Sequence, residues 1–364
     1  MKVKELIQSF EQIYPLAFQE SYDNSGSQIS FPDNDINGIL ICLDITETIV
    51  DEAIEKKCNL IISHHPILFK ALKKINPNTQ QGRIVIKSIQ HQISIYAIHT
   101  NFDSSLQGTN RILADLLQLQ HIQLLEPFEH QLKKLVTFVP HDYAEKVRKA
   151  LFAAGAGNIG NYDSCSYNVE GYGTFKANEN CNPYVGKINE EHHEPEIRIE
   201  TIFPAYIQAK VMDALFKAHP YEEVAYDIYL LDNPYNQVGI GMMGYLLDPM
   251  SISAFLQYVK QNIGSKVIRF NKSKKEIIQK VALCSGSGAS YIQTAYKMKV
   301  DAYITADLKY HDFTDCPPDL LLIDAGHFET EIHFVQKIFE IITKKNTNFA
   351  VRLSDYCSNP VNYF

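Results

Sequence analysis

The sequence lacks any apolar run long enough to cross a bilayer, which needs about 20 consecutive apolar residues. Its N-terminus also lacks the apolar stretch of a signal peptide, because Lys2, Lys4 and Glu5 interrupt it. The first residues instead have the pattern of an amphipathic helix. We therefore expect a soluble cytoplasmic protein with no membrane segment.

The sequence also lacks any CxxC pair, and its cysteines are scattered and odd in number: Cys42, Cys58, Cys165, Cys181, Cys284, Cys316 and Cys357. This pattern excludes a small disulfide-stapled fold. It indicates reduced, mostly structural thiols, as in cytoplasmic proteins.

An excess of positive charge is absent too. Lys and Arg total 34 against 42 Asp and Glu, which gives a net charge of −8. Sequence-independent binding of nucleic acid needs cations that displace phosphate counterions, so this balance disfavours that class of function. Binding of nucleic acid stays possible only through a local patch of basic residues.

What the sequence does contain is 364 residues, 45% of them hydrophobic, which is enough for two or three domains with real cores. Short apolar runs alternate with amphipathic stretches near both ends of the chain. This alternation is typical of α/β domains in which crossover helices join parallel strands. We expect strands at 38–43, 59–63, 93–98, 280–285, 301–305 and 320–324, and a last helix at 328–344.

Between these two parts the rhythm changes to strand, helix, two strands, helix, strand, which is the ferredoxin-like order. The sequence therefore predicts an α/β domain interrupted by an inserted α+β domain. The first part of the α/β domain is residues 1–128, the insert is 129–233, and the second part is 234–364.

Three clusters of metal-binding residue types follow predicted strands. His64 and His65 come directly after the second strand, and Asp103 follows the third. His327 and Glu331 follow the last strand and are four residues apart, so a helix would place them on one face. Ligands of open α/β sheets bind beyond the carboxyl ends of the strands.

Each cluster has an ordinary structural explanation as well. A His-His doublet is usually a surface feature, and we interpret His192 and His193 in this way, as residues of a solvated acidic loop. Asp103 could be a helix N-cap, and Glu331 could simply favour the positive end of its helix. Three clusters at three strand ends nevertheless favour a metal site, since imidazole and carboxylate together suit zinc and iron.

The number of ligands favours two cations. Five side chains exceed the three protein ligands of a usual catalytic zinc site. If one carboxylate bridges, they give three bonds to each of two metals, and each metal keeps an open position for a hydrolytic step.

Six segments, at residues 22–26, 63–69, 99–103, 219–231, 306–312 and 324–331, carry a resemblance that covers nearly the whole chain. Together they resemble the dinuclear-metal family of Ngg-interacting factor three, whose members often carry the name GTP cyclohydrolase 1 type 2 homologue. It includes the long form, in which a domain similar to PII and CutA-like trimeric modules interrupts the metal domain.

The resemblance implies two divalent metal ions per subunit, zinc or iron, held by His64, His65, Asp103, His327 and Glu331. It also implies a toroidal homohexamer with the sites facing an internal cavity. Residues near the centre that could orient a ligand or act as acid, base or phosphate contact are His99, Asn101, Lys309 and His311. The run at 285–288 is either a tight turn or an anion cradle, and we interpret 219–223 as structural or oligomeric.

Two classes of function stay open. One is a metal-dependent hydrolase of a nucleotide or phosphoester-type substrate. The other is a non-catalytic, metal-binding oligomer that binds or regulates a partner. Function has to be argued from a site and not from a fold, so a single sequence identifies neither the substrate nor the metal.

Overall fold

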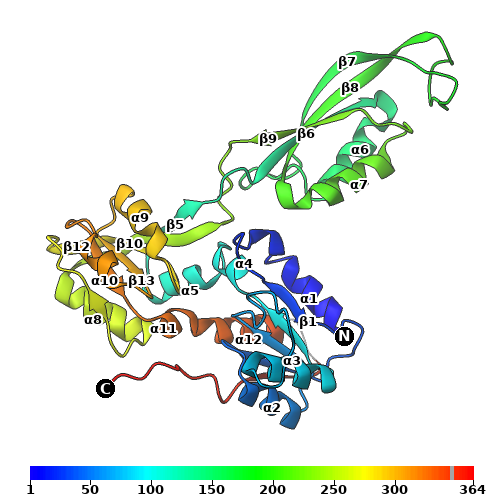
Figure 1. Ribbon diagram of the computed structural model, residues 1–364. Helices are drawn as coiled ribbons and strands as arrows, with labels where there is room; N and C mark the ends of the chain where they lie inside the picture. The colour runs from blue at the N-terminus through cyan, green and yellow to red at the C-terminus, as the bar shows by residue number, and fades with distance from the viewer. Residues whose placement is uncertain (345–347) are drawn as a thin grey trace. The chain divides into compact units, whose positions relative to one another are not determined.

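The protein is a mixed α/β structure with several sheets, described here by a computed structural model for residues 1–344 and 348–364. The chain forms two compact units (Figure 1). The first unit contains Met1–Pro127 and Asn236–Phe364, and the second contains Phe128–Tyr235.

The first unit contains two sheets, and the first of these is built mainly from the N-terminal part of the chain. Its strand order is β1-β4-β3-β2-β15, in which β1 is antiparallel to β4 and the other neighbours are parallel. The strands are β1 (Gly26–Ile29), β2 (Gly38–Cys42), β3 (Leu60–Ser63), β4 (Ser94–Ala97) and β15 (Ala350–Leu353). Every residue of β2, β3 and β4 is buried, because helices cover both faces of the sheet.

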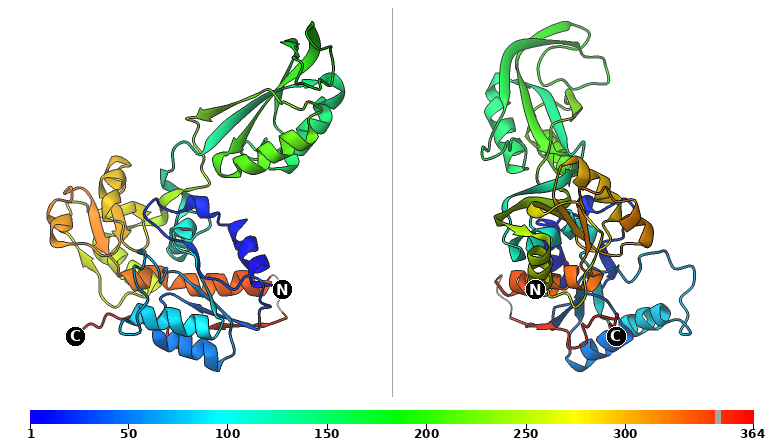
Figure 2. Two further views of the ribbon diagram at one scale, coloured as in Figure 1. Left: turned by 45° about the vertical axis from the view of Figure 1, so that its right-hand side comes forward. Right: turned by 90° about the vertical axis from the view of Figure 1, so that its left-hand side faces the viewer.

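Alternate residues of these strands pack against different helices. Ile39 and Ile41 contact the core beneath α1 (Val3–Glu11) and α12 (His333–Lys344), whereas Leu40 and Cys42 contact the core beneath α2 (Glu47–Glu55) and α3 (Gln80–Gln90). Figure 2 shows these helices on opposite sides of the sheet. The strand ends therefore open between two helical layers.

The second sheet of this unit has the order β11-β14-β13-β12-β10-β5, with a parallel centre of β12, β13 and β14. Helices α5 and α8 pack on it around Phe255 and Val259. Its elements and the remaining short helices of the unit are η1 (Leu16–Phe18), α4 (Thr100–Asp103), α5 (Thr109–Leu116), β5 (Gln120–Pro127), β10 (Gly239–Ser251), α8 (Ile252–Ile263), β11 (Arg269–Phe270), β12 (Ile277–Leu283), η3 (Ala289–Tyr291), α9 (Ile292–Lys297), β13 (Ala302–Thr305), α10 (Tyr310–Thr314), β14 (Leu321–Asp324) and α11 (His327–Glu331).

The second unit has one antiparallel sheet of order β7-β8-β6-β9, covered on one face by two helices. Leu135, Val139 and Ile199 lie in the core between the sheet and these helices. Its elements, in chain order, are β6 (Leu132–Pro140), α6 (His141–Ala153), β7 (Tyr167–Lys176), β8 (Glu191–Pro204), η2 (Ala205–Ile207), α7 (Gln208–Ala218) and β9 (Tyr226–Leu231).

The second unit enters the chain between two paired strands of the first. Strands β5 and β10 are antiparallel neighbours, and Pro127 and Gly239 are register partners at the ends facing the insertion. A Cβ on Gly239 would lie 2.4 Å from the carbonyl oxygen of Glu126, so the close approach of the two strands requires glycine here.

Several expectations from sequence differ from the structure. The expected helix at 328–344 is two helices, α11 and α12, which are separated at Ile332. His192 and His193 are not in a loop but in β8, where His192 Nε2 contacts Glu194 Oε2 at 2.7 Å. Strand β15 is not among the strands expected from the sequence, and it joins the first sheet and not the sheet of β12 to β14.

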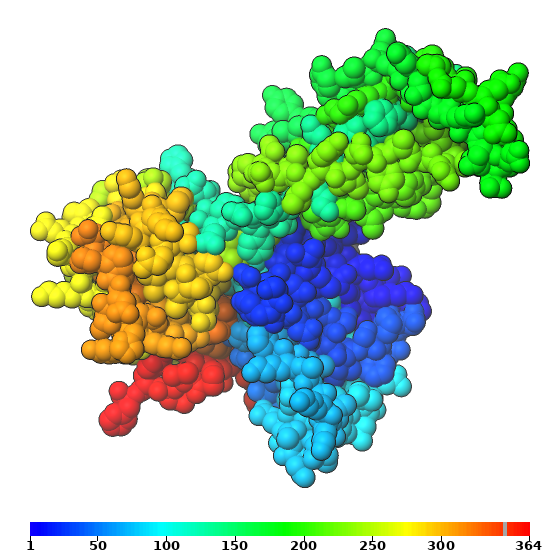
Figure 3. Space-filling view, turned by 45° about the horizontal axis from the view of Figure 1, so that its top comes forward, coloured from blue at the N-terminus to red at the C-terminus, as the bar shows by residue number. Residues whose placement is uncertain are grey.

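Within the residues that the structure describes, no helix is both long and apolar enough to cross a membrane. The space-filling view in Figure 3 shows the last residues of the chain, drawn in red, at the surface of the first unit.

The core of the first sheet generates a stability prediction at Phe334, whose side chain is fully buried against the rings of Phe102 and His64, with centroid distances of 5.5 and 4.8 Å. We expect Phe334→Ala to destabilise the first unit by about 3–5 kcal/mol, because it leaves a cavity. Urea unfolding followed by circular dichroism tests this. Phe270→Ala, at a half-exposed position, is the control and should leave the midpoint almost unchanged.

The insertion point generates a second prediction. Replacing residues 128–235 with a short Gly-Ser linker should leave the first unit folded, because Pro127 and Gly239 are already register partners and the buried Val238, which pairs with Ser105, is kept. The shortened chain should keep a cooperative thermal transition. A chain that purifies only as an aggregate would contradict the prediction.

Candidate metal centre

Three chain segments converge in the first unit, each directly after a parallel strand. His64 and His65 follow β3, and both of their backbone N–H groups donate to the carbonyl of Leu43, at 3.1 and 3.0 Å. Asp103 ends α4, which comes after β4, and α11 comes after β14. Because β14 belongs to the second sheet, the cluster forms where the carboxyl ends of two different sheets meet.

Two imidazoles and a carboxylate lie at the heart of this cluster. His65 Nε2 and His327 Nε2 are 3.4 Å apart, and they lie 3.0 and 2.9 Å from Glu331 Oε2. That carboxylate oxygen is buried, yet it has no partner in hydrogen-bond geometry. The spacing of four residues thus brings His327 and Glu331 together on one helical turn, as the sequence predicts.

The fully buried His64 and the partly buried Asp103 lie beside them. His64 Nε2 is 3.7 Å from Asp103 Oδ2 and 3.8 Å from Glu331 Oε1, distances too long for hydrogen bonds. His64 Nε2 and Asp103 Oδ1 are both buried without a partner. Buried polar atoms without partners are costly, so three of them in one cluster suit a site that could hold a metal ion.

The other nitrogen of each imidazole is held by an acceptor. His65 Nδ1 lies 2.8 Å from Asp44 Oδ1, and His327 Nδ1 lies 2.7 Å from Asp307 Oδ2. His64 Nδ1 lies 2.9 Å from the carbonyl oxygen of Ile98. Because these oxygens only accept, each Nδ1 carries a proton, and Nε2 is the ring nitrogen left to face the cluster.

Electrostatics agree with a place for positive charge. Burial alone would lower the pKa of His65 and His327, but carboxylates outweigh it: Asp44 and Glu331 raise the pKa of His65 to about 10, and Asp307 and Glu331 raise that of His327 to about 11. Burial raises the pKa of Asp103. Burial acts in the same direction on Glu331, but the imidazoles around it hold its pKa well below the usual range. The carboxylates therefore need positive charge beside them, from protons or from a cation.

The structure separates the other candidate residues. His99 groups with His64 and His65, with ring nitrogens within 4.8 Å of one another, and its Nδ1 lies 2.7 Å from Asp23 Oδ1. Asn101 accepts from the backbone N–H of His99, so it fixes the segment that carries His99.

Lys309 and His311 lie elsewhere in the unit. They are exposed at the start of α10, and none of the contacts among residues 1–344 and 348–364 joins either side chain to the cluster.

A glycine makes room for the shared carboxylate. Gly286 has φ +59°, and a Cβ there would lie 2.2 Å from Glu331 Oε1. Its backbone N–H donates to the hydroxyl of Thr330 at 3.0 Å, so the 285–288 turn contacts α11 directly. The turn that the sequence leaves open as an anion cradle thus lies against the Glu331 carboxylate.

Sequence reasoning missed the three aspartates that hold the imidazoles, namely Asp23, Asp44 and Asp307. Asp44 and Asp307 each follow a buried strand by two residues, the position at which the ligand candidates were found. That position is the signal that could have identified them.

The family model for Duf34/NIF3 (NGG1p interacting factor 3) matches residues 1–360. The chain belongs to this family. Relatives named "GTP cyclohydrolase 1 type 2 homolog" include proteins of Bacillus subtilis, 36% identical over 99% of this chain and 98% of theirs, and of Halalkalibacterium halodurans, 38% identical over 98% of both.

Solved structures agree with this membership. A Bacillus cereus protein related to NIF3 matches with a TM-score of 0.86 and 39% identity over 100% of this chain and 99% of that one. The Staphylococcus aureus protein SA1388 matches with a TM-score of 0.79 and 27% identity over the same shares. The whole chain, insert included, therefore has the architecture of these long members.

The aspartates behind the imidazoles generate a binding prediction. Asp44→Asn should weaken zinc binding about 10- to 100-fold, because His65 loses the carboxylate that fixes its tautomer and orientation. Competition with a chromophoric chelator measures this. Asp51→Asn, an exposed aspartate on α2, is the control, and equal affinities for the two variants would contradict the prediction.

The glycine under Glu331 generates another. Gly286→Ala should weaken zinc binding at least as much as Asp44→Asn, because the new methyl group displaces the Glu331 carboxylate. Gly160→Ala is a matched control, since Gly160 has nearly the same φ, +58°, with nothing within 4 Å of its Cβ position. A loss of affinity in both variants would point to backbone strain instead.

Proposed function

We propose that this protein is a metal-dependent hydrolase of a nucleotide or phosphoester-type substrate. The observation that carries the proposal is the set of three buried side-chain atoms without hydrogen-bond partners, on His64, Asp103 and Glu331, beside the Nε2 atoms of His65 and His327. Such a donor set suits zinc or iron.

The proposed ligands are His64, His65, Asp103, His327 and Glu331, for two divalent cations. Glu331 turns Oε1 toward His64 and Oε2 toward His65 and His327, which suits this carboxylate to be shared by both. A bound pair of divalent cations supplies Lewis acidity that lowers the pKa of water and stabilises the charge developed in hydrolysis.

Two aromatic side chains support a substrate with a flat ring. Tyr22 is 64% exposed and Phe69 is 43% exposed, and their ring centroids are 6.3 Å apart. Phe69 lies 6.2 Å from the ring of His99, which itself groups with His64 and His65. Exposed aromatic rings next to a metal cluster can stack on a nucleobase, so a nucleotide fits better than a simple phosphomonoester.

The name that relatives carry, GTP cyclohydrolase 1 type 2 homologue, agrees with a nucleotide substrate and makes GTP the first compound to test. The assembly into a homohexamer and a cytoplasmic location belong to the same proposal. They would bring several such sites together, but the argument for hydrolysis rests on one chain.

Turnover by metal-loaded protein tests the proposal. The protein is loaded anaerobically with zinc or iron, its metal content is measured, and it is assayed with GTP, other nucleotides and phosphodiesters. We expect two metal ions per chain and a loss of turnover of more than about 100-fold in His64→Ala and Glu331→Ala, beyond the effect of losing a residue that only orients a ligand.

His91→Ala is the control, because His91 is an exposed histidine at the end of α3. It should keep both the metal content and the turnover. Metal-loaded protein that turns over none of these compounds would contradict the hydrolase and leave the non-catalytic, metal-binding oligomer as the better explanation.

A further inference from the structure

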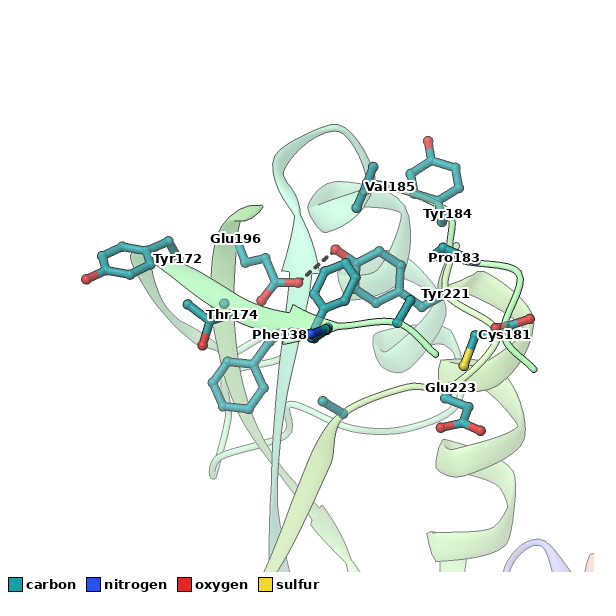
Figure 4. Close-up of a pocket in the computed structure, with 16 residues that line it drawn as sticks. Phe138, Tyr172, Thr174, Cys181, Pro183, Tyr184, Val185, Glu196, Tyr221 and Glu223 are labelled. Carbon is teal, nitrogen blue, oxygen red and sulfur yellow. Dashed lines mark hydrogen bonds between the residues drawn. The ribbon is translucent and has the colours of Figure 1, made fainter. Parts of the chain in front are cut away.

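The second unit contains a pocket of about 460 Å³ that has no part in the metal centre. Two of its lining residues, Phe138 and Glu196, lie on the face of the sheet opposite to α6 and α7, because they alternate with Val139 and Ile197 of the core. The segment 177–190 between β7 and β8 closes it with Cys181 and Tyr184 (Figure 4). A volume of this size suits a small molecule.

The pocket contains a buried carboxylate that lacks a cation. Glu196 is only 8% exposed, and its one hydrogen bond within the described residues is from the hydroxyl of Tyr221 to Oε1, at 2.9 Å. None of the ion pairs among residues 1–344 and 348–364 involves Glu196, and Arg198, two residues along β8, pairs with Glu200 instead. Burial raises the pKa of Glu196, as expected for a desolvated carboxylate without a cation beside it.

A glycine holds the second oxygen of Glu196 in place. A Cβ on Gly173 of β7 would lie 2.4 Å from Glu196 Oε2, so any side chain at position 173 would displace the carboxylate. Gly173 lines the pocket too, and in the part of the chain that the structure describes Glu196 Oε2 has no hydrogen bond. The free oxygen is therefore available to a ligand.

Aromatic rings and acidic groups make up much of the remaining wall. Figure 4 shows the Glu196 carboxylate directed toward Tyr221, with the ring of Phe138 beside them. The lining also includes Tyr172, Phe175, Tyr184, Glu222 and Glu223, against one lysine, Lys176. Aromatic faces attract cations, and the excess of carboxylates repels anions.

The geometry points to a binding site for a small organic cation that carries a planar amidinium or guanidinium group. Such a group donates N–H bonds to a carboxylate oxygen and stacks its flat face on tyrosine and phenylalanine rings. This site is independent of the proposed hydrolysis, since all of its lining residues belong to the second unit. It gives the 219–223 segment, through Tyr221, a role in holding the ligand-binding carboxylate.

Calorimetry on the full chain, with benzamidine as the probe, tests the proposal. We expect a Kd below roughly 1 mM, which is within reach of a ligand of this size. Glu196→Gln removes the charge while keeping the shape and should weaken binding at least tenfold, and Gly173→Ala should do the same by displacing the carboxylate. Glu170→Gln, an exposed position on β7, should bind like the unchanged protein.

Ligand chemistry and source are tested in parallel. Benzoate has the same ring with the opposite charge and should not bind. Agmatine carries a guanidinium group and should bind, whereas guanosine has a similar N–H edge without the charge and should not bind. Tighter binding of guanosine than of agmatine would overturn the proposal. Equal binding of benzoate and benzamidine, or full affinity in Glu196→Gln, would overturn the proposal.

Alkylation of two cysteines gives a second readout that needs no variant. Cys181 lines the pocket, whereas Cys165 is similarly half-buried but lies outside it. Benzamidine should slow the modification of Cys181 by a maleimide and leave that of Cys165 unchanged, as mapped by mass spectrometry. Two results together would overturn the proposal: benzamidine at any concentration fails to slow the alkylation of Cys181, and a high protein concentration alone slows it. They would show that a second copy of the chain covers the pocket.

Discussion

The first unit depends on one constraint: carboxylates and imidazoles are buried together at the meeting point of two sheets. Removal of these groups from water is costly unless opposite charge lies beside them. Acceptors around the cluster reduce this cost, because Asp44, Asp307 and the carbonyl of Ile98 accept hydrogen bonds from the Nδ1 atoms of the imidazoles. The Nε2 atoms are left to face Glu331 and Asp103. The donor set is therefore already oriented in the folded chain.

Much of this cluster could be predicted because it follows from strand ends. The buried runs at 38–43, 59–63, 93–98, 301–305 and 320–324 correspond to β2, β3, β4, β13 and β14 within one or two residues. The order of the strands in space could not be predicted. Local periodicity does not reveal β5 and β10, because exposed positions interrupt their apolar pattern. It also does not reveal that β15 pairs with the first sheet. The three aspartates that contact the imidazoles were missed for a related reason. The sequence around an acidic residue at a strand end does not identify the side chain that it contacts in the folded protein.

Two glycines have the same physical role in different units. Gly286 lies against the carboxylate of Glu331, and Gly173 lies against that of Glu196. In both places the absence of a Cβ leaves space for a buried acid, which would otherwise be pushed toward solvent. Gly286 also has a positive φ, +59°, which favours glycine in its turn, whereas Gly173 lies inside β7 without a positive φ. In both units the lack of a side chain on a glycine therefore determines where a neighbouring carboxylate can lie.

The insertion between Pro127 and Gly239 has a consequence for engineering and for evolution. Since the two residues are already neighbours across a ladder, the 108-residue unit Phe128–Tyr235 occupies the place of a tight turn. Its loss or exchange would leave the pairing of β5 with β10 in register. The same junction should accept a foreign module, such as a fluorescent reporter, so that the scaffold can be tagged internally without a terminal fusion.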